Sequence, residues 1–189
     1  MKNPLFAKIE TEIAKYEMPK NRVNYQRFFK EKLKYPEGLK SNFLKRISNT
    51  CFKEIQRLPK VEILSICDQL FVLDRRYYRY FATEWALKIK DQLIKSDFEL
   101  FATWLKKYVD NWGICDVLGG GPIGTLVDRY PELFAETSKW STSTNRWLRR
   151  AAAVCLIPAV QNNRQLENVF EMANRLLKDP DDMVQKGYG

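Results

Sequence analysis

The chain has 189 residues, of which 45% are hydrophobic and 29% are charged, a balance typical of a globular protein rather than a disordered one. No apolar run approaches the roughly 18 residues that a membrane-spanning helix needs, and the first residues lack the apolar stretch of a secretory signal, so we expect a soluble cytoplasmic protein. The net charge of +9 favours a polyanionic partner, and the absence of histidine excludes Ser-His-Asp triads, Cys-His dyads and histidine-containing zinc sites.

The first half of the chain shows apolar residues at helical spacing almost throughout. The predicted elements are, in order, a helix with Leu5, Ile9, Ile13 and Tyr16 on one face, an aromatic-rich segment over residues 24–34, a helix over residues 42–57 capped by Ser41, a helix after Pro59 that carries Ile63, Leu64, Cys67, Leu70 and Phe71, and a helix capped by Asp74 that carries Tyr77, Tyr78, Phe81 and Trp85.

The second half continues the helical pattern and is interrupted by a glycine run. The predicted elements are a helix over residues 97–109 capped by Ser96, a helix capped by Asn111 that bears Trp112 and Asp116, a break at Gly119-Gly-Gly-Pro122, a short helix from Pro131, a helix opened by Thr144 or Asn145 that carries Trp147, Leu148, Ala151 and Ala152, and a helix opened by Asn162 or Asn163 that ends at Asp179-Pro180. Pro122 fits the first position of a restarted helix, and the glycine run lacks the Lys-Ser/Thr of a phosphate-binding loop.

Two fold classes fit this pattern of helix, short turn and helix. Paired helices recur at roughly 35–45 residues, which is the spacing of HEAT-like repeats, and an irregular helical bundle is the alternative. No segment alternates apolar and polar residues between hairpin turns, so we expect no sheet. The four cysteines are scattered without a C-x-x-C pair, and no disulfide framework or metal site is expected.

Two groups of residues have the chemistry of a binding site. Trp112 and Asp116 are four apart, so a helix places them on one face, where an indole and a carboxylate suit a cationic ligand. Arg149 and Arg150 follow Trp147 and form a basic flank suited to phosphate. The alternatives are a core tryptophan beside a solvated aspartate, and a solvated charged face.

Basic side chains also gather in the first half of the chain. Lys20, Arg22, Arg27, Lys30, Lys32 and Lys34 lie close together in the sequence, and Arg75, Arg76 and Arg79 interleave with tyrosines. Such interleaving favours nucleic acid, although aromatic residues at helical spacing also occur in cores.

The motif Trp112-Gly-Ile-Cys-Asp116-Val-Leu, followed by Gly124 and by Trp147-Leu-Arg-Arg150-Ala-Ala, resembles the AlkD-type DNA alkylation-repair glycosylases. The segments from Gly38 to Arg46 and around Arg79 are similar to the family's glycine-basic and aromatic-basic segments, and the resemblance spans most of the chain. Around Gly113 the family often has an acidic or aromatic residue instead.

The resemblance implies an all-α, right-handed solenoid of HEAT-like antiparallel helix pairs that excises N3- or N7-alkylated purines from duplex DNA without a cofactor. Trp112 and Asp116 are then the catalytic residues: the tryptophan packs against the lesion nucleotide, and the aspartate stabilises positive charge on the sugar and orients a water. The residues expected to contact DNA are Arg150, Arg149, Trp147, Arg46 and Arg79.

The family typically continues past a Lys-Gly-Tyr-Gly-like segment into a helix opened by tryptophan. We therefore expect residues 1–189 to form a single HEAT-like domain that lacks the family's C-terminal helices, and to act as a monomer on DNA. The alternative function is a non-catalytic HEAT-like module that binds DNA or another protein.

Overall fold

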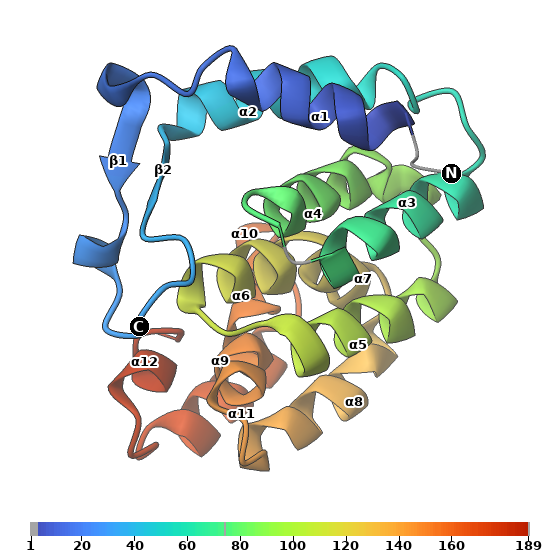
Figure 1. The fold of residues 1–189 in the computed structure, drawn as a ribbon. Helices are drawn as coiled ribbons and strands as arrows, with labels where there is room; N and C mark the ends of the chain where they lie inside the picture. The colour runs from blue at the N-terminus through green and yellow to red at the C-terminus, as the bar shows by residue number, and fades with distance from the viewer. Residues whose placement is uncertain (1–3, 74, 189) are drawn as a thin grey trace. The chain divides into compact units, whose positions relative to one another are not determined.

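The computed structural model describes residues 4–73 and 75–188, which are mostly helical (Figure 1). The chain divides into two compact units, an N-terminal unit of residues 1–86 and a C-terminal unit of residues 87–189. None of the helices within the described residues is long and apolar enough to cross a membrane. The predominance of helices among the described elements confirms the all-α expectation at the level of fold class.

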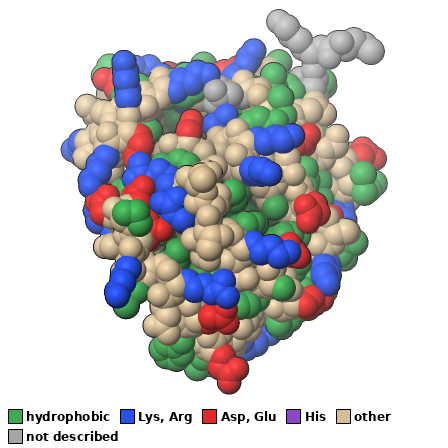
Figure 2. All heavy atoms as spheres, turned by 90° about the horizontal axis from the view of Figure 1, so that it is seen from below, with side chains coloured by type: hydrophobic (Ala, Val, Ile, Leu, Met, Phe, Trp, Pro, Cys, Tyr) green, Lys and Arg blue, Asp and Glu red, His purple; other side chains and the backbone are tan. Residues whose placement is uncertain are grey.

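The two units differ in charge. The N-terminal unit holds 18 Lys and Arg against 10 Asp and Glu, a net charge of +8, whereas the C-terminal unit holds 14 against 13, a net charge of +1. On the face drawn in Figure 2, Lys and Arg side chains stand among Asp and Glu side chains. The basic excess of the chain thus belongs almost wholly to its first 86 residues.

Helices, short 3-10 turns and one hairpin make up the N-terminal unit. In order they are α1 (Pro4–Ala14), η1 (Pro19–Asn21), β1 (Arg22–Asn24), η2 (Gln26–Phe28), β2 (Glu37–Leu39), α2 (Ser41–Phe52), α3 (Lys60–Leu73) and α4 (Tyr78–Lys88), whose last residues continue into the second unit. The predicted face of the first helix is confirmed for Leu5, Ile9 and Ile13, which are buried, whereas Tyr16 lies beyond the end of α1 and is half-buried. Trp85 of α4 is fully buried and donates its indole N–H to the Ser48 hydroxyl at 3.0 Å.

The strands β1 and β2 pair in antiparallel register, with Arg22 opposite Leu39. The expectation of no sheet was wrong here, because each strand has three residues, too few to show alternation. Two tyrosines hold the hairpin: Tyr25 Oη donates to the Leu39 carbonyl at 2.7 Å, and the Leu39 N–H donates to Tyr77 Oη at 2.7 Å. A Cβ on Gly38 would lie 3.1 Å from the Tyr25 ring, so glycine allows this packing.

The C-terminal unit consists of short helices and turns. They are η3 (Lys90–Gln92), η4 (Lys95–Asp97), α5 (Phe98–Tyr108), α6 (Trp112–Leu118), the π-helical η5 (Gly119–Ile123), α7 (Gly124–Arg129), η6 (Pro131–Leu133), α8 (Phe134–Lys139), η7 (Trp140–Thr142), α9 (Arg146–Val154), α10 (Ile157–Gln161), α11 (Leu166–Leu176) and α12 (Asp182–Gln185). The break at the glycine run and the short helix from Pro131 are confirmed.

Two of the predicted N-caps are confirmed. The Asn111 side chain accepts from the Ile114 N–H at 3.1 Å, and the Asn145 side chain accepts from the Trp147 N–H at 2.9 Å. These bonds fix the starts of α6 and α9, the helices that carry the motif residues.

Other predicted helix ends were wrong. The cap position of α2 is Lys40 rather than Ser41, and that of α5 is Asp97 rather than Ser96. A left-handed Gln165 precedes α11, which replaces the expected start at Asn162 or Asn163. The helices α2 and α11 end at Phe52 and Leu176, earlier than expected, and Asp74 lies outside the described residues. The sequence thus offers more polar residues that could cap a helix than the folded chain uses as caps.

The glycine run breaks a helix, and Gly124 after it allows two helices to pack closely. The backbone leaves helical geometry at Gly121 (φ −89°, ψ −108°), and α7 restarts at Gly124, two residues after the expected Pro122. A Cβ on Gly124 would lie 2.8 Å from Pro158 Cγ and 2.9 Å from the Gly119 carbonyl oxygen. The run is therefore a helix break, and Gly124 after it allows the close packing of α7 against α10.

Candidate functional site

The helix α6 carries the first pair of candidate residues. Asn111 caps it, and Trp112 and Asp116 lie one turn apart within it. Trp112 is half-buried, and the Asp116 side chain is 31% exposed. An aromatic ring and a partly open carboxylate therefore lie on neighbouring turns, as expected.

Arg150 of α9 donates two hydrogen bonds to the Asp116 carboxylate. Its Nε donates to Oδ1 at 2.6 Å and its Nη2 donates to Oδ2 at 2.7 Å, while its Nη1 donates to the Met183 carbonyl. A bidentate guanidinium fixes the plane of a carboxylate. The orientation of Asp116 is thus set by a residue 34 positions later in the chain.

The sequence of α9 explains why Arg150 lies inside. Ala151, Ala152 and Val154 are buried, and the small alanines let α9 approach its neighbours closely. The Cys115 thiol contacts the Trp147 carbonyl oxygen at 3.4 Å, which joins α6 to α9 next to the ion pair. The Arg150 side chain is only 7% exposed as a result.

The charge states in this cluster follow from burial and pairing. Burial opposes the charged form of Arg150, but the hydrogen bond and the charge of Asp116 outweigh it, so the pKa of Arg150 is raised. Burial raises the pKa of the Cys115 thiol as well, and the nearby Asp116 charge adds to this effect. Cys115 is therefore a protonated core residue and no nucleophile.

Arg150 lies inside the protein rather than on the open flank that the sequence predicted, and its expected contact with phosphate stays a prediction. Helical phase alone put it on an open flank, but the acceptors on α6 and at Met183 draw the guanidinium inward. A buried arginine needs such partners. Arg150 therefore acts on Asp116 rather than on solvent.

The other arginines of α9 also pair with aspartates, and Arg149 is the more buried of the two. Arg149 donates to both oxygens of Asp179, from Nε at 2.7 Å and from Nη2 at 3.2 Å, and its side chain is 15% exposed. Arg146 pairs with Asp181 and lies over the Trp147 ring, with Cζ 5.2 Å from the ring centroid. Trp147 itself is 6% exposed. Arg149 and Trp147, expected at the DNA surface, thus belong largely to the packing of α9.

The remaining two expected DNA contacts lie in the N-terminal unit. Arg46 is exposed on α2, with Cζ 5.9 Å from the Tyr16 ring centroid. Arg79 is half-buried on α4, and its Nε donates to the Phe71 carbonyl at 3.4 Å.

Sequence reasoning missed the C-terminal partners of α9. Asp179 and Asp181 accept from two of its arginines. Burial acts to raise the pKa of Asp179, but the hydrogen bonds from Arg149 and from the Asp181 N–H outweigh burial and lower that pKa. A Cβ on Gly187 would lie 3.0 Å from Arg150 Cγ, so glycine admits the arginine stem. The signal was an acidic run, Asp179-Pro-Asp-Asp182, that matches the basic run on α9.

The Arg150–Asp116 ion pair does not line the recess that the structure shows in the C-terminal unit. A recess of about 500 Å³ is lined by residues of α5, α8 and η7, among them Phe98, Lys106 and Trp140, and it includes neither Trp112 nor Asp116. Within residues 4–73 and 75–188, no group of three or more Cys, Asp or Glu side chains is placed to hold a metal ion.

Comparison with known proteins adds one match. A family model described as DNA alkylation repair enzyme matches residues 9–189, which is nearly the whole chain. No individual curated protein matches it.

Proposed function

Because this chain belongs to the family of DNA alkylation repair enzymes, we propose that it is a DNA glycosylase that releases cationic N3- or N7-alkylated purines from duplex DNA. The observation that carries the proposal is the Asp116 carboxylate, held by a buried arginine yet 31% exposed, one turn from Trp112. The residues assigned to catalysis are Asp116 and Trp112.

The proposed reaction does not need a general acid to protonate the leaving base. An alkylated purine of this class carries a positive charge, so the N-glycosidic bond breaks with its electron pair passing to the ring and neutralising it. A sugar with oxocarbenium character remains, and a fixed negative group stabilises it electrostatically. Water adds to C1′ and gives up a proton, to Asp116 or to solvent. The lack of histidine is compatible with each of these steps.

Asp116 suits this role because it is held in place before the substrate arrives. Arg150 occupies one acceptor site on each oxygen, and an ionised carboxylate offers about four. The remaining sites are those for a sugar cation or a water. The arginine lowers the net charge of the pair, but a preorganised group needs no reorientation at the transition state. Arg150 is therefore a positioning residue.

Trp112 supplies an aromatic surface next to the carboxylate. The face of an indole attracts positive charge and packs well on a sugar. Its half-buried position on the first turn of α6 restricts its motion while leaving part of it accessible.

The finer features that the family resemblance implies accompany this proposal. We propose that the helices pair as HEAT-like repeats in a right-handed solenoid, that the protein acts as a monomer without a cofactor, and that Arg46 and Arg79 contribute to DNA binding. Arg149 and Trp147 support α9 in this scheme.

The test is release of free methylated purine from alkylated duplex DNA. Asp116→Asn is expected to lower the rate about 100-fold or more, the size of effect seen when one preorganised electrostatic group is removed. Asp179→Asn is the matched control, because it removes the acidic partner of another α9 arginine and leaves Asp116 intact. Circular dichroism checks the fold of both variants.

Two outcomes would contradict the proposal. One is wild-type protein that binds duplex DNA but releases no base, which would favour the non-catalytic binding module. The other is an equal drop in activity for Asp116→Asn and Asp179→Asn, which would indicate a structural role for Asp116.

A further inference from the structure

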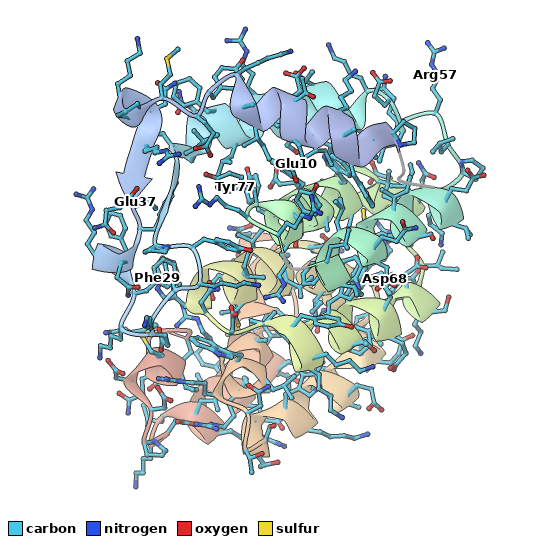
Figure 3. All side chains as sticks on the ribbon, in the orientation of Figure 1. Glu10, Phe29, Glu37, Arg57, Asp68 and Tyr77 are labelled. Carbon is cyan, nitrogen blue, oxygen red and sulfur yellow. The ribbon has the colours of Figure 1, made fainter. Side chains whose placement is uncertain are left out.

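The tip of the β1–β2 hairpin, residues 25–36, is rich in cations and aromatic rings. It carries Arg27, Lys30, Lys32 and Lys34 against a single acidic residue, Glu31. Arg27 and Lys32 are exposed, and neither forms an ion pair with any described side chain. Phe28 is 52% exposed, an unusual position for a phenyl ring. Figure 3 shows the side chains of this hairpin, with Phe29 and Glu37 labelled.

The arginine and the exposed phenyl ring form one surface. Arg27 Cζ lies 4.6 Å from the Phe28 ring centroid, so a cation covers one side of an apolar ring. A polyanion with apolar sugar edges, such as DNA, meets both kinds of group at once.

The tip is held in one conformation by its own hydrogen bonds. The Gln26 side chain donates to the Phe29 carbonyl at 3.1 Å and to the Glu31 carbonyl at 2.8 Å, and it accepts from the Leu33 N–H at 2.9 Å. At its base, the Tyr25 N–H donates to the Pro36 carbonyl at 2.7 Å. A preorganised loop loses less conformational entropy on binding than a flexible one.

We propose that the hairpin tip is a DNA-contacting element, in which Arg27 and Lys32 bind backbone phosphates and Phe28 packs against the duplex. The proposal rests on the proposed function for its choice of DNA as the polyanion. It fits the charge of the N-terminal unit, +8 from 18 basic and 10 acidic residues. The hairpin tip also presents exposed cations to a ligand, whereas Arg149 and Arg150 of α9 are buried against aspartates.

The experiment measures binding of the full chain to a short unmodified duplex at several salt concentrations. The slope of log K against log salt is negative, and each phosphate that the protein no longer neutralises reduces its magnitude by about 0.9. Arg27→Gln/Lys32→Gln is therefore expected to reduce the magnitude of the slope by up to about 1.8 and to weaken binding about 10-fold or more at low salt. Phe28→Ala is expected to weaken binding about 5-fold with an unchanged slope, because it removes no charge.

Two further variants separate a specific interaction from general effects. Lys106→Gln/Lys107→Gln removes the same charge from exposed positions of α5 and is expected to have a smaller effect on affinity and slope. Gln26→Ala leaves every charge in place but removes the three bonds that shape the tip, and about 3-fold weaker binding is expected.

Equal affinities and slopes for Arg27→Gln/Lys32→Gln and Lys106→Gln/Lys107→Gln would overturn the proposal. So would weaker binding that is confined to vesicles of acidic phospholipid, which are titrated in parallel. Base release is measured separately on wild-type protein, so its absence counts against the glycosylase function and leaves the binding comparison unaffected.

Discussion

The arginines of α9 and the cations of the hairpin tip show two uses of positive charge in one chain. On α9, Arg146, Arg149 and Arg150 are each bound to an aspartate of the same unit. On the hairpin tip, Arg27 and Lys32 are exposed and without acidic partners among the described side chains. A basic run in a sequence therefore indicates a ligand surface only where the rest of the chain provides no acids to match it.

The largest expected effect tests whether the α9 arginines are structural. Arg150→Met removes the guanidinium that binds both Asp116 oxygens and leaves the Asp116 carboxylate and the Met183 carbonyl to be satisfied otherwise. Breaking a buried pair costs about 3–5 kcal/mol, and we expect about 3 kcal/mol in the free energy of unfolding because Asp116 is partly exposed. Urea denaturation measures it.

Arg175→Met is the control for this variant. Arg175 pairs with Glu171, and the two side chains are 45% and 46% exposed, so a decrease below about 1 kcal/mol is expected in the free energy of unfolding. Equal decreases for the two variants would erase the distinction between internal and surface arginines.

A second prediction concerns the close helix packing that supports the C-terminal unit. Gly124→Ala places a Cβ 2.8 Å from Pro158 Cγ and 2.9 Å from a backbone oxygen, so α7 must move, at a cost of about 2 kcal/mol. Gly120→Ala, whose Cβ would meet Val154 Cγ1 at 3.6 Å, is expected to change stability by less than about 0.5 kcal/mol. Thermal melts of both variants give the comparison, which fails if Gly120→Ala is the more destabilising.

The smallest expected effect is the pH dependence of the Arg149–Asp179 pair. The pKa of Asp179 is lowered in the folded protein, so its contribution is complete above the ordinary aspartate pKa of about 3.9 and is lost as the pH falls through the lowered value. Wild-type protein should exceed Asp179→Asn by about 1 kcal/mol in the free energy of unfolding at pH 6, because asparagine keeps the shape and one acceptor oxygen of the aspartate and loses only its charge. The gap should close in acid. Urea midpoints measured from pH 6 to pH 3 test this, and a gap that widens in acid would contradict it.

Local signals predicted most of the helices and two decisive caps. Asn111 and Asn145 work through bonds to residues two or three positions away, so their roles are visible in the sequence. The same holds for the placement of Trp112 and Asp116 on one helix, which needs only helical spacing.

The features that the sequence did not predict depend on partners far away in the chain. Arg150 points inward because it donates hydrogen bonds to Asp116 and to the Met183 carbonyl. These acceptors lie 34 residues before it and 33 residues after it in the sequence. The hairpin escaped prediction because Tyr77, 38 residues after Leu39, supplies the bond that its short strands lack. Helical phase can place a side chain on a face, but it does not say which acceptor will be there.

The bond from Arg150 to the Met183 carbonyl has a consequence for the order of assembly during synthesis. The ribosome makes α6 and α9 before the segment around residue 183, so a nascent chain holds Asp116 and Arg150 without the third acceptor. The full set of bonds around the carboxylate forms only once translation has passed that point. A chain stopped short of residue 183 would therefore carry every proposed catalytic residue and still lack the finished site.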